Sequence, residues 1–178
     1  MLRKNDVNVA EFLRNIDLFE TLETEECLDL LRITEQFVIG AGERLFAEGD
    51  AASGMYVVER GEVEVRIKTD ANRELVLAHL GNGSAIGEMS LIAGGPRSAS
   101  VGAVSQTQGF FLAREAFDAL RTEGDPIAFK IVLQLARTLD RRRRQLEERF
   151  AQLREDPEVD ARLKEKSTKE LIARVRKA

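Results

Sequence analysis

The stretch Ala85-Ile86-Gly87-Glu88-Met89-Ser90-Leu91-Ile92-Ala93-Gly94-Gly95-Pro96-Arg97-Ser98-Ala99-Ser100-Val101 decides how this chain is interpreted. It places a carboxylate at Glu88 and a guanidinium at Arg97 among apolar side chains, where charges are rarely buried without a partner. Its glycines, proline and serines predict sharp bends that leave backbone N–H groups accessible, and a short helical turn at 89–93 would direct further amides toward an anion. A carboxylate for hydroxyl groups, with a guanidinium and free N–H groups for an anion, suits a sugar phosphate.

The runs Ile86-Gly87-Glu88-x-Ser90-Leu91 and Pro96-Arg97-Ser98-Ala99 resemble the phosphate-binding cassette of the cyclic-nucleotide-binding domain family. That family includes the catabolite activator protein, the regulatory subunits of cAMP-dependent kinase and nucleotide-gated channels. The resemblance covers about residues 12–150, and it combines several spaced elements with distinct roles. The residues after this range resemble no part of the family.

The resemblance implies a ligand site with one role for each cassette residue. Glu88 would bind the ribose 2′-hydroxyl, and Arg97 would pair with the cyclic phosphate. The hydroxyl of Ser98 and the amide of Ala99 would hold phosphate oxygens. Apolar residues at matching positions would line the pocket, and a residue of the C-terminal helix would cover the base. The expected ligand-binding residues are Gly87, Glu88, Met89, Ser90, Arg97, Ser98, Ala99, Val65, Leu77, Leu80, Ile86 and Arg142.

Length and composition are those of a globular domain with an appendage. The chain has 178 residues, of which 43% are hydrophobic and 33% are charged. No apolar run approaches the length of a membrane span, and the N-terminus MLRKNDVNVAEF lacks the apolar core of a signal peptide. Cys27, the one cysteine, cannot form an internal disulfide and is expected to fill the core of a cytoplasmic protein.

The apolar pattern predicts helices first and strands afterwards. Over residues 9–35 the apolar residues recur at helical spacing, which predicts two short helices, the second opening near Thr24. Val63, Val65 and Ile67 then alternate with charged residues, as in a strand with one buried face. Similar Val-rich segments between turns are expected to be strands: Gln36–Ile39, Gly54–Glu59, Glu62–Lys68, Glu74–His79 and Ser100–Val104. Together with the resemblance, this predicts an α+β fold: an antiparallel, eight-stranded, jelly-roll-like β-roll with short N-terminal helices and a long C-terminal helix.

Catalysis is not expected. A β-roll of this kind could be a metal-binding cupin, but such sites need several imidazoles and His79 is the one histidine. Zinc and haem sites fail for the same lack of His and Cys, and no serine has a base to activate it. We therefore expect no enzyme, no metal and no cofactor apart from the nucleotide ligand. Tyr56 is expected in the core and not against the base.

A long helix is expected after the roll. Arg114–Thr122 predicts a short helix, after which Asp125 caps and Pro126 begins a helix that runs to about residue 155. Its apolar residues follow a spacing of three and four, namely Val132, Leu135, Leu139, Leu146 and Leu153. Arginines interrupt this seam, so it either packs against a second helix that tolerates polar positions or faces something polar.

The family resemblance implies that this helix closes over the purine and forms a homodimer contact. Arg142 falls roughly where bacterial regulators of the family touch the base, and we hypothesise that it caps the base. Arg137 and Leu139 are the other candidates, and the sequence does not choose among them.

Four segments are expected: an N-terminal helical segment 1–34, a β-roll 35–124 with the cassette at 85–101 and the following short helix, a lid or dimerisation helix 125–155, and a helical tail 156–178. In the tail, Pro157 predicts a break, and Ser167-x-x-Glu170 predicts the capping box of a last helix.

The tail does not support sequence-specific DNA binding. Of the 27 Lys and Arg residues, 14 lie within 135–178, with 9 of the 31 acidic residues. The basic and acidic residues interleave, which favours i,i+4 pairs on a solvated helix over a phosphate track. The tail is also too short for two helices, a turn and a wing. A stand-alone sensor and a regulatory piece of a longer chain both remain open.

The function expected from the sequence is a cyclic-nucleotide receptor that signals through its C-terminal helix to a dimer interface or an unidentified effector. Ser98 offers a hydroxyl next to the cassette arginine but occurs in cAMP binders as well, so cAMP is favoured over cGMP. One alternative is a truncated or atypical transcription regulator of the catabolite-activator type. The other is a dimeric scaffold that binds no ligand.

Overall fold

The structure is a computed structural model that describes residues 4–69 and 73–155. It contains two compact units, which meet inside the last helix after Leu135, and each is described by itself. The helices are α1 (Lys4–Arg14), α2 (Thr24–Arg32), the 3-10 turn η1 (Glu88–Leu91), α3 (Arg114–Glu123) and α4 (Pro126–Glu155). In these residues no helix is long and apolar enough to cross a membrane.

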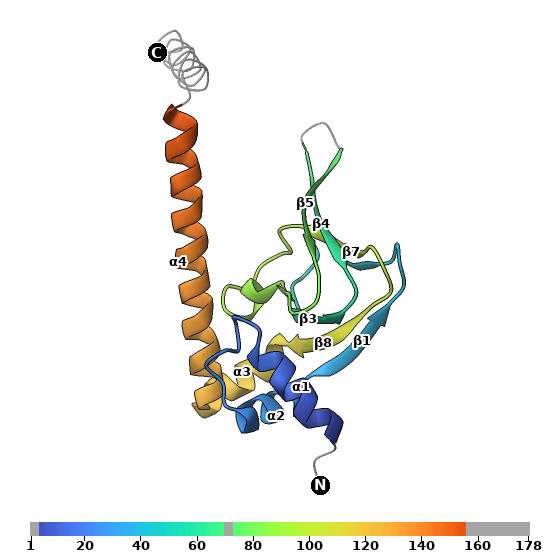
Figure 1. Ribbon diagram of the computed structural model, residues 1–178, viewed down its shortest axis with the longest axis vertical. Helices are drawn as coiled ribbons and strands as arrows, with labels where there is room; N and C mark the ends of the chain where they lie inside the picture. Colours follow the sequence, from blue (N-terminus) through green and yellow to red (C-terminus); the bar gives the residue numbers. More distant parts are fainter. Residues whose placement is uncertain (1–3, 70–72, 156–178) are drawn as a thin grey trace. The chain divides into compact units, whose positions relative to one another are not determined.

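Within the described residues, eight strands form two antiparallel sheets of four (Figure 1). The first sheet has the order β1-β8-β3-β6 and the second has the order β2-β7-β4-β5. The strands are β1 (Glu35–Ile39), β2 (Arg44–Phe46), β3 (Gly54–Arg60), β4 (Val63–Lys68), β5 (Glu74–Leu80), β6 (Ala85–Ile86), β7 (Ser100–Ala103) and β8 (Thr107–Ala113). The cassette therefore starts in one sheet, at β6, and ends in the other, at β7.

In the described residues, two clusters of apolar side chains form the core of the first unit, which ends at Leu135. The larger cluster joins the helices to the first sheet, and its buried residues include Leu13, Phe19, Leu30, Met55, Leu112, Phe117 and Ile131. The smaller cluster lies inside the roll and consists of Val58, Val63, Ile86 and Val101, with Leu45, Phe46, Tyr56, Val65 and Leu80 packed against it. The cassette contributes to both clusters, because Leu91 belongs to the first and Ile86 to the second.

The first turns of α4 are fixed to the N-terminal helices. The Asp125 carboxylate accepts a hydrogen bond from the Ile127 amide at 2.8 Å, as expected for an N-cap. The ammonium of Lys130 contacts the Glu26 carboxylate of α2, and the buried Gln134 amide donates to the backbone oxygen of Asp17 at 3.2 Å. The start of α4 is thus part of the core.

The predicted fold class is confirmed, and several local predictions are confirmed with it. α2 begins at Thr24, α3 covers Arg114–Glu123 and α4 begins at Pro126. Cys27 is fully buried on α2, where burial raises the pKa of its thiol to about 11. The predicted break at Pro157 and capping box at Ser167 lie outside the described residues.

Three details differ from the sequence predictions. β2, β6 and β8 were not predicted, because the predicted strands are Val-rich and these three contain no valine. The helical turn of the cassette begins one residue earlier than predicted, as a 3-10 turn at Glu88–Leu91, and it continues to residue 93, where the Ala93 amide donates to the Met89 carbonyl at 2.9 Å. Within β4, Val63 is buried but Val65 and Ile67 are only half-buried, so the predicted buried face is incomplete.

Candidate ligand site: a buried arginine beside a glycine turn

The first half of the cassette is a tight turn between β6 and η1. Gly87 has a φ of 71°, in the left-handed region that favours glycine, and its carbonyl accepts hydrogen bonds from the amide and the hydroxyl of Ser90 at 3.0 and 2.7 Å. Ser90 and Leu91 are buried, which anchors η1. Glu88 is the first residue of η1 and is half-buried, so its carboxylate is held on a fixed turn.

Arg97 is a charged side chain in the interior of the roll. It is 6% exposed, and its guanidinium carbon lies 4.1 Å from the ring centroid of Phe46 and 5.8 Å from that of Tyr56. Its Nε and Nη1 atoms are buried and make no hydrogen bond within the part of the chain described. Burial lowers the pKa of this guanidinium, and the nearby Tyr56 and Asp50 partly offset that effect.

Gly87 is required for the guanidinium to occupy this place. A Cβ at Gly87 would overlap Nη1 of Arg97, so the absence of a side chain lets the guanidinium lie directly against the turn. The residue predicted to bind phosphate, Arg97, therefore lies against the turn that carries Glu88, the residue predicted to bind ribose.

The backbone around Arg97 is paired with the loop between β2 and β3. The Arg97 amide donates to the Asp50 carbonyl and the Gly49 amide donates to the Arg97 carbonyl, both at 2.8 Å. Ala51 and Pro96 form an isolated β-bridge beside this pair. The carboxylate of Asp50 also closes its own loop by accepting from the Ala47 amide at 2.7 Å.

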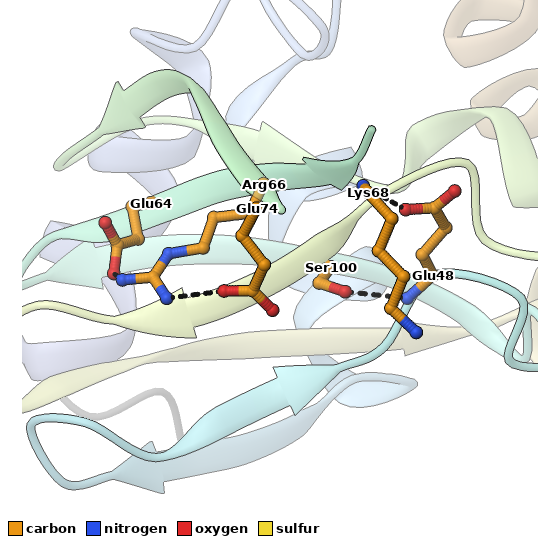
Figure 2. Close-up of polar contacts among 6 residues, drawn as sticks. All are labelled: Glu48, Glu64, Arg66, Lys68, Glu74 and Ser100. Atoms are coloured by element: carbon orange, nitrogen blue, oxygen red, sulfur yellow. Dashed lines mark hydrogen bonds and ion pairs between the residues drawn. The ribbon is translucent and has the colours of Figure 1, made fainter. Parts of the chain in front are cut away.

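Glu48 ties the same loop to the second sheet (Figure 2). Its amide donates to the hydroxyl of Ser100 on β7, and its carboxylate accepts from the Lys68 amide at the end of β4, both at 2.9 Å. On β4 and β5, Arg66 contacts the carboxylates of Glu64 and Glu74. The loop that holds the Arg97 backbone is thus attached to β4 and β7 by Glu48.

The remaining predicted site residues lie in several environments. Ser98 is exposed, while Met89 and Ala99 are half-buried. Ile86 is buried, and Val65 and Leu80 pack against the smaller cluster, whereas Leu77 on β5 is 54% exposed. Arg142 is exposed and lies on α4 in the second unit.

The sequence predictions missed the residues that surround Arg97. Phe46, Glu48 and Asp50 lie on β2 and the following loop, in a segment that carried no strand prediction. Their signal in the sequence is weak, because a single aromatic residue followed by Ala-Glu-Gly-Asp indicates a turn and no particular partner. Tyr56 was predicted to lie in the core, and it does pack against the smaller cluster.

A glycine turn that carries a carboxylate, beside a buried guanidinium whose Nε and Nη1 make no hydrogen bond in the described residues, suits the binding of a small anionic ligand. Comparisons with known proteins identify the family. The sequence profile of the Cyclic nucleotide-binding domain matches residues 36–123. The chain belongs to the cyclic nucleotide-binding domain family, as do regulatory subunits of cAMP-dependent kinase and catabolite-activator-type regulators.

Two curated relatives illustrate the range of the family. The chain is 36% identical over 91 residues to the cAMP-dependent protein kinase type II regulatory subunit of Drosophila melanogaster, which is 51% of this chain and 24% of that protein. It is 34% identical over 127 residues to the Cyclic AMP receptor protein of Thermus thermophilus, which is 71% of this chain and 59% of that protein. The chain thus spans between a quarter and three-fifths of these two relatives.

Solved structures agree on the fold. The N-terminal domain of a transcriptional regulator from Streptomyces coelicolor is similar with a TM-score of 0.67 and 30% identity, over 73% of this chain and 93% of that one. A cyclic nucleotide-binding domain from Methylobacillus flagellatus has a TM-score of 0.70 and 29% identity, over 82% of both chains. The regulatory domain of Toxoplasma gondii PKA, crystallised with cAMP, has a TM-score of 0.62 and 28% identity, over 67% of this chain and 45% of that one.

Replacing Ser100 with alanine tests how the loop beside Arg97 is fixed. Ser100 is 7% exposed, so its loss leaves the Glu48 amide without its acceptor in a partly buried place. We expect Ser100→Ala to lower the free energy of unfolding by about 1–2 kcal/mol in urea denaturation. The matched control is Ser105→Ala, which removes a similar acceptor for the Glu62 amide at an exposed position, where water replaces it. Equal losses in the two variants would contradict this account.

Proposed function

We propose that this domain is a receptor module for a cyclic nucleotide, with cAMP preferred over cGMP. The observation that carries the proposal is the buried guanidinium of Arg97, whose Nε and Nη1 make no hydrogen bond in the described residues. A buried charge is costly unless it is paired, and a phosphate oxyanion supplies both the charge and the acceptors that a guanidinium needs. The named cAMP proteins among the relatives support cAMP as the ligand.

The remaining cassette residues take the roles that the family pattern assigns. Glu88 binds the ribose 2′-hydroxyl from the first position of η1. Ser98 and Ala99, directly after Arg97, hold further phosphate oxygens, and Gly87, Met89 and Ser90 form the turn that carries Glu88. The apolar residues Val65, Leu77, Leu80 and Ile86 line the wall for the base. The exposure of Leu77 supports this role, since an apolar side chain on a pocket wall loses contact with water when the ligand binds.

Substitution of Arg97 separates binding from folding. We expect Arg97→Met to weaken cAMP binding at least 100-fold in calorimetry, because the charge-assisted hydrogen bonds to phosphate are lost. The melting temperature of the ligand-free variant should stay the same or rise, since a buried charge without an ion pair stabilises the fold little. In the unsubstituted protein cAMP should bind more tightly than cGMP.

The matched control is Arg60→Met, which makes the same replacement at an exposed position on β3. It should bind cAMP as the unsubstituted protein does. Unchanged affinity in Arg97→Met, or no binding of either nucleotide by the unsubstituted protein, would refute the receptor function.

Binding is transmitted through α4. A ligand shifts an equilibrium by as much as it favours one state over the other, so a residue of α4 must contact the ligand in the bound state. Arg142 is the residue proposed for this contact, as a cap on the base. Arg137 and Leu139 are the alternatives on the same helix.

Alanine substitution of Arg142 tests the cap. We expect Arg142→Ala to weaken cAMP binding about tenfold in calorimetry, the loss of one cation–π or hydrogen-bonding contact to the base. Arg143→Ala, next to it on an exposed turn and paired with Asp140 and Glu147, is the control and should leave affinity unchanged. Unchanged affinity in Arg142→Ala would move the role to Arg137 or Leu139.

The same helix is proposed to form a homodimer contact. Leu146 and Phe150 are 55% and 58% exposed, four residues apart on one face of a segment that is otherwise mostly charged. Apolar side chains at this spacing gain stability when a second helix covers them.

A glutamate at the apolar position tests the contact. We expect Leu146→Glu to shift the protein from dimer to monomer in sedimentation velocity, because the carboxylate would be buried in the contact. Gln145→Glu adds the same charge at the neighbouring exposed position and should leave the dimer in place. A monomeric unsubstituted protein would rule the dimer out.

The second candidate is a transcription regulator of the catabolite-activator type, of which this chain would be a part. It is favoured by the match to the Cyclic AMP receptor protein of Thermus thermophilus and by the Streptomyces coelicolor domain. DNA binding that falls steeply with rising salt would support it, and no DNA binding at low salt would end it for this chain.

A further inference from the structure

The Phe46 ring lies against the guanidinium of Arg97, which also contacts the glycine turn. The guanidinium carbon lies 4.1 Å from the centroid of the Phe46 ring, well inside the distance at which a cation is attracted to an aromatic face. The missing side chain of Gly87 leaves room for Nη1. The guanidinium therefore contacts one aromatic ring and one stretch of backbone.

A β-bulge directs the Phe46 ring into the roll. β2 pairs with β7, where Arg44 lies opposite Gly102 and Phe46 opposite Val101, so the register shifts at Leu45. A bulge of this kind places consecutive side chains on the same side of a strand. Both Leu45 and Phe46 accordingly pack against the smaller apolar cluster, which contains the buried Val101.

The Phe46 ring belongs to a larger aromatic group that fixes its place. Its centroid lies 5.9 Å from that of Tyr56, which in turn lies 5.3 Å from Phe37 and 4.6 Å from Phe111. These residues come from both sheets, so the ring under Arg97 cannot turn away without disturbing the packing between the sheets.

The ring contact matters because Nε and Nη1 of Arg97 make no hydrogen bond in the described residues that would orient the side chain. The backbone of Arg97, by contrast, is held at both its amide and its carbonyl. A long side chain fixed only at its backbone keeps much rotamer freedom, and a ligand then bears the cost of ordering it. Stacking on a rigid ring removes that cost before the ligand arrives.

We propose that Phe46 is a positioning residue for the ligand phosphate: its ring holds the guanidinium of Arg97 in the orientation that binds the anion. This inference rests on the proposed receptor function and adds a residue to it. Phe46 itself need not touch the nucleotide. Its contribution is to the affinity for the phosphate and not to the choice of base.

Substitutions at Phe46 test the inference. We expect Phe46→Leu, which keeps an apolar side chain but removes the ring, to weaken cAMP binding about tenfold in calorimetry. Phe46→Tyr keeps the aromatic face and should bind within about twofold of the unsubstituted protein. Because the base is not involved, cGMP binding should fall in Phe46→Leu by the same factor as cAMP binding. Phe37→Leu is the matched control, because it removes another ring that contacts Tyr56 in the same aromatic group and should leave affinity unchanged.

A spectroscopic measurement tests the contact without any ligand. In the unsubstituted protein the Arg97 Nε–H resonance should carry a ring-current shift, assigned by its loss in Arg97→Met. That shift should persist in Phe46→Tyr and Phe37→Leu and disappear in Phe46→Leu. Should Phe46→Leu fail to fold, an Arg97 resonance without a ring-current shift in the unsubstituted protein would still overturn the inference.

The outcomes separate the two proposals. If the unsubstituted protein binds cAMP and Phe46→Leu binds it equally well, the role of Phe46 is wrong and the receptor function stands. An equal loss of affinity for cAMP in Phe37→Leu would also overturn the role of Phe46, since general packing of the aromatic group would then explain the effect. If the unsubstituted protein binds neither nucleotide, both proposals fall.

Discussion

The structure depends on how the interior of a small β-roll accommodates one positive charge. Arg97 is 6% exposed, and its guanidinium is enclosed by an aromatic ring, a glycine turn and backbone. Burial lowers its pKa, which shows that the surroundings disfavour the charged form. A fold selected for stability alone would place an apolar side chain here, because removing an uncompensated buried charge is commonly neutral or favourable. An arginine at this position is favourable when a negatively charged ligand pairs with its guanidinium.

The neighbouring elements are arranged to keep that charge in place. The absence of a side chain at Gly87 leaves room for the guanidinium, and the β2–β3 loop forms hydrogen bonds with the Arg97 backbone. Glu48 connects this loop to β4 and β7 by two further hydrogen bonds. Each of these hydrogen bonds contributes only about 0.5–3 kcal/mol on its own, with the bond to the Glu48 carboxylate toward the upper end. Together they hold the backbone of Arg97 and leave room for its guanidinium, and such preorganisation favours the binding of a small, rigid anion.

The sequence predicted the fold class and the cassette because both depend on local patterns. Gly87, Glu88 and Arg97 lie within one short segment, and their spacing is characteristic even without the rest of the chain. The surroundings of Arg97 could not be predicted in the same way, since Phe46 and Asp50 lie about fifty residues earlier. They reach Arg97 through the pairing of β2 with β7 and through backbone hydrogen bonds. Alternation could not reveal β2 either, because its bulge puts Leu45 and Phe46 on the same side.

The first turns of α4 set a limit on how a bound ligand could act on this helix. Ile127, Ile131 and Leu135 are almost completely buried, and each such side chain contributes roughly 1.5–3 kcal/mol on burial. Lys130 adds a polar contact to α2, and Gln134 adds one to the connection between α1 and α2. To change an equilibrium from 1:99 to 99:1, a ligand must favour one state by about 5.5 kcal/mol. Detaching residues 126–135 from the core would cost about that much free energy or more. A ligand-driven change that leaves these residues in place and acts on the helix after Leu135 is therefore the less costly route.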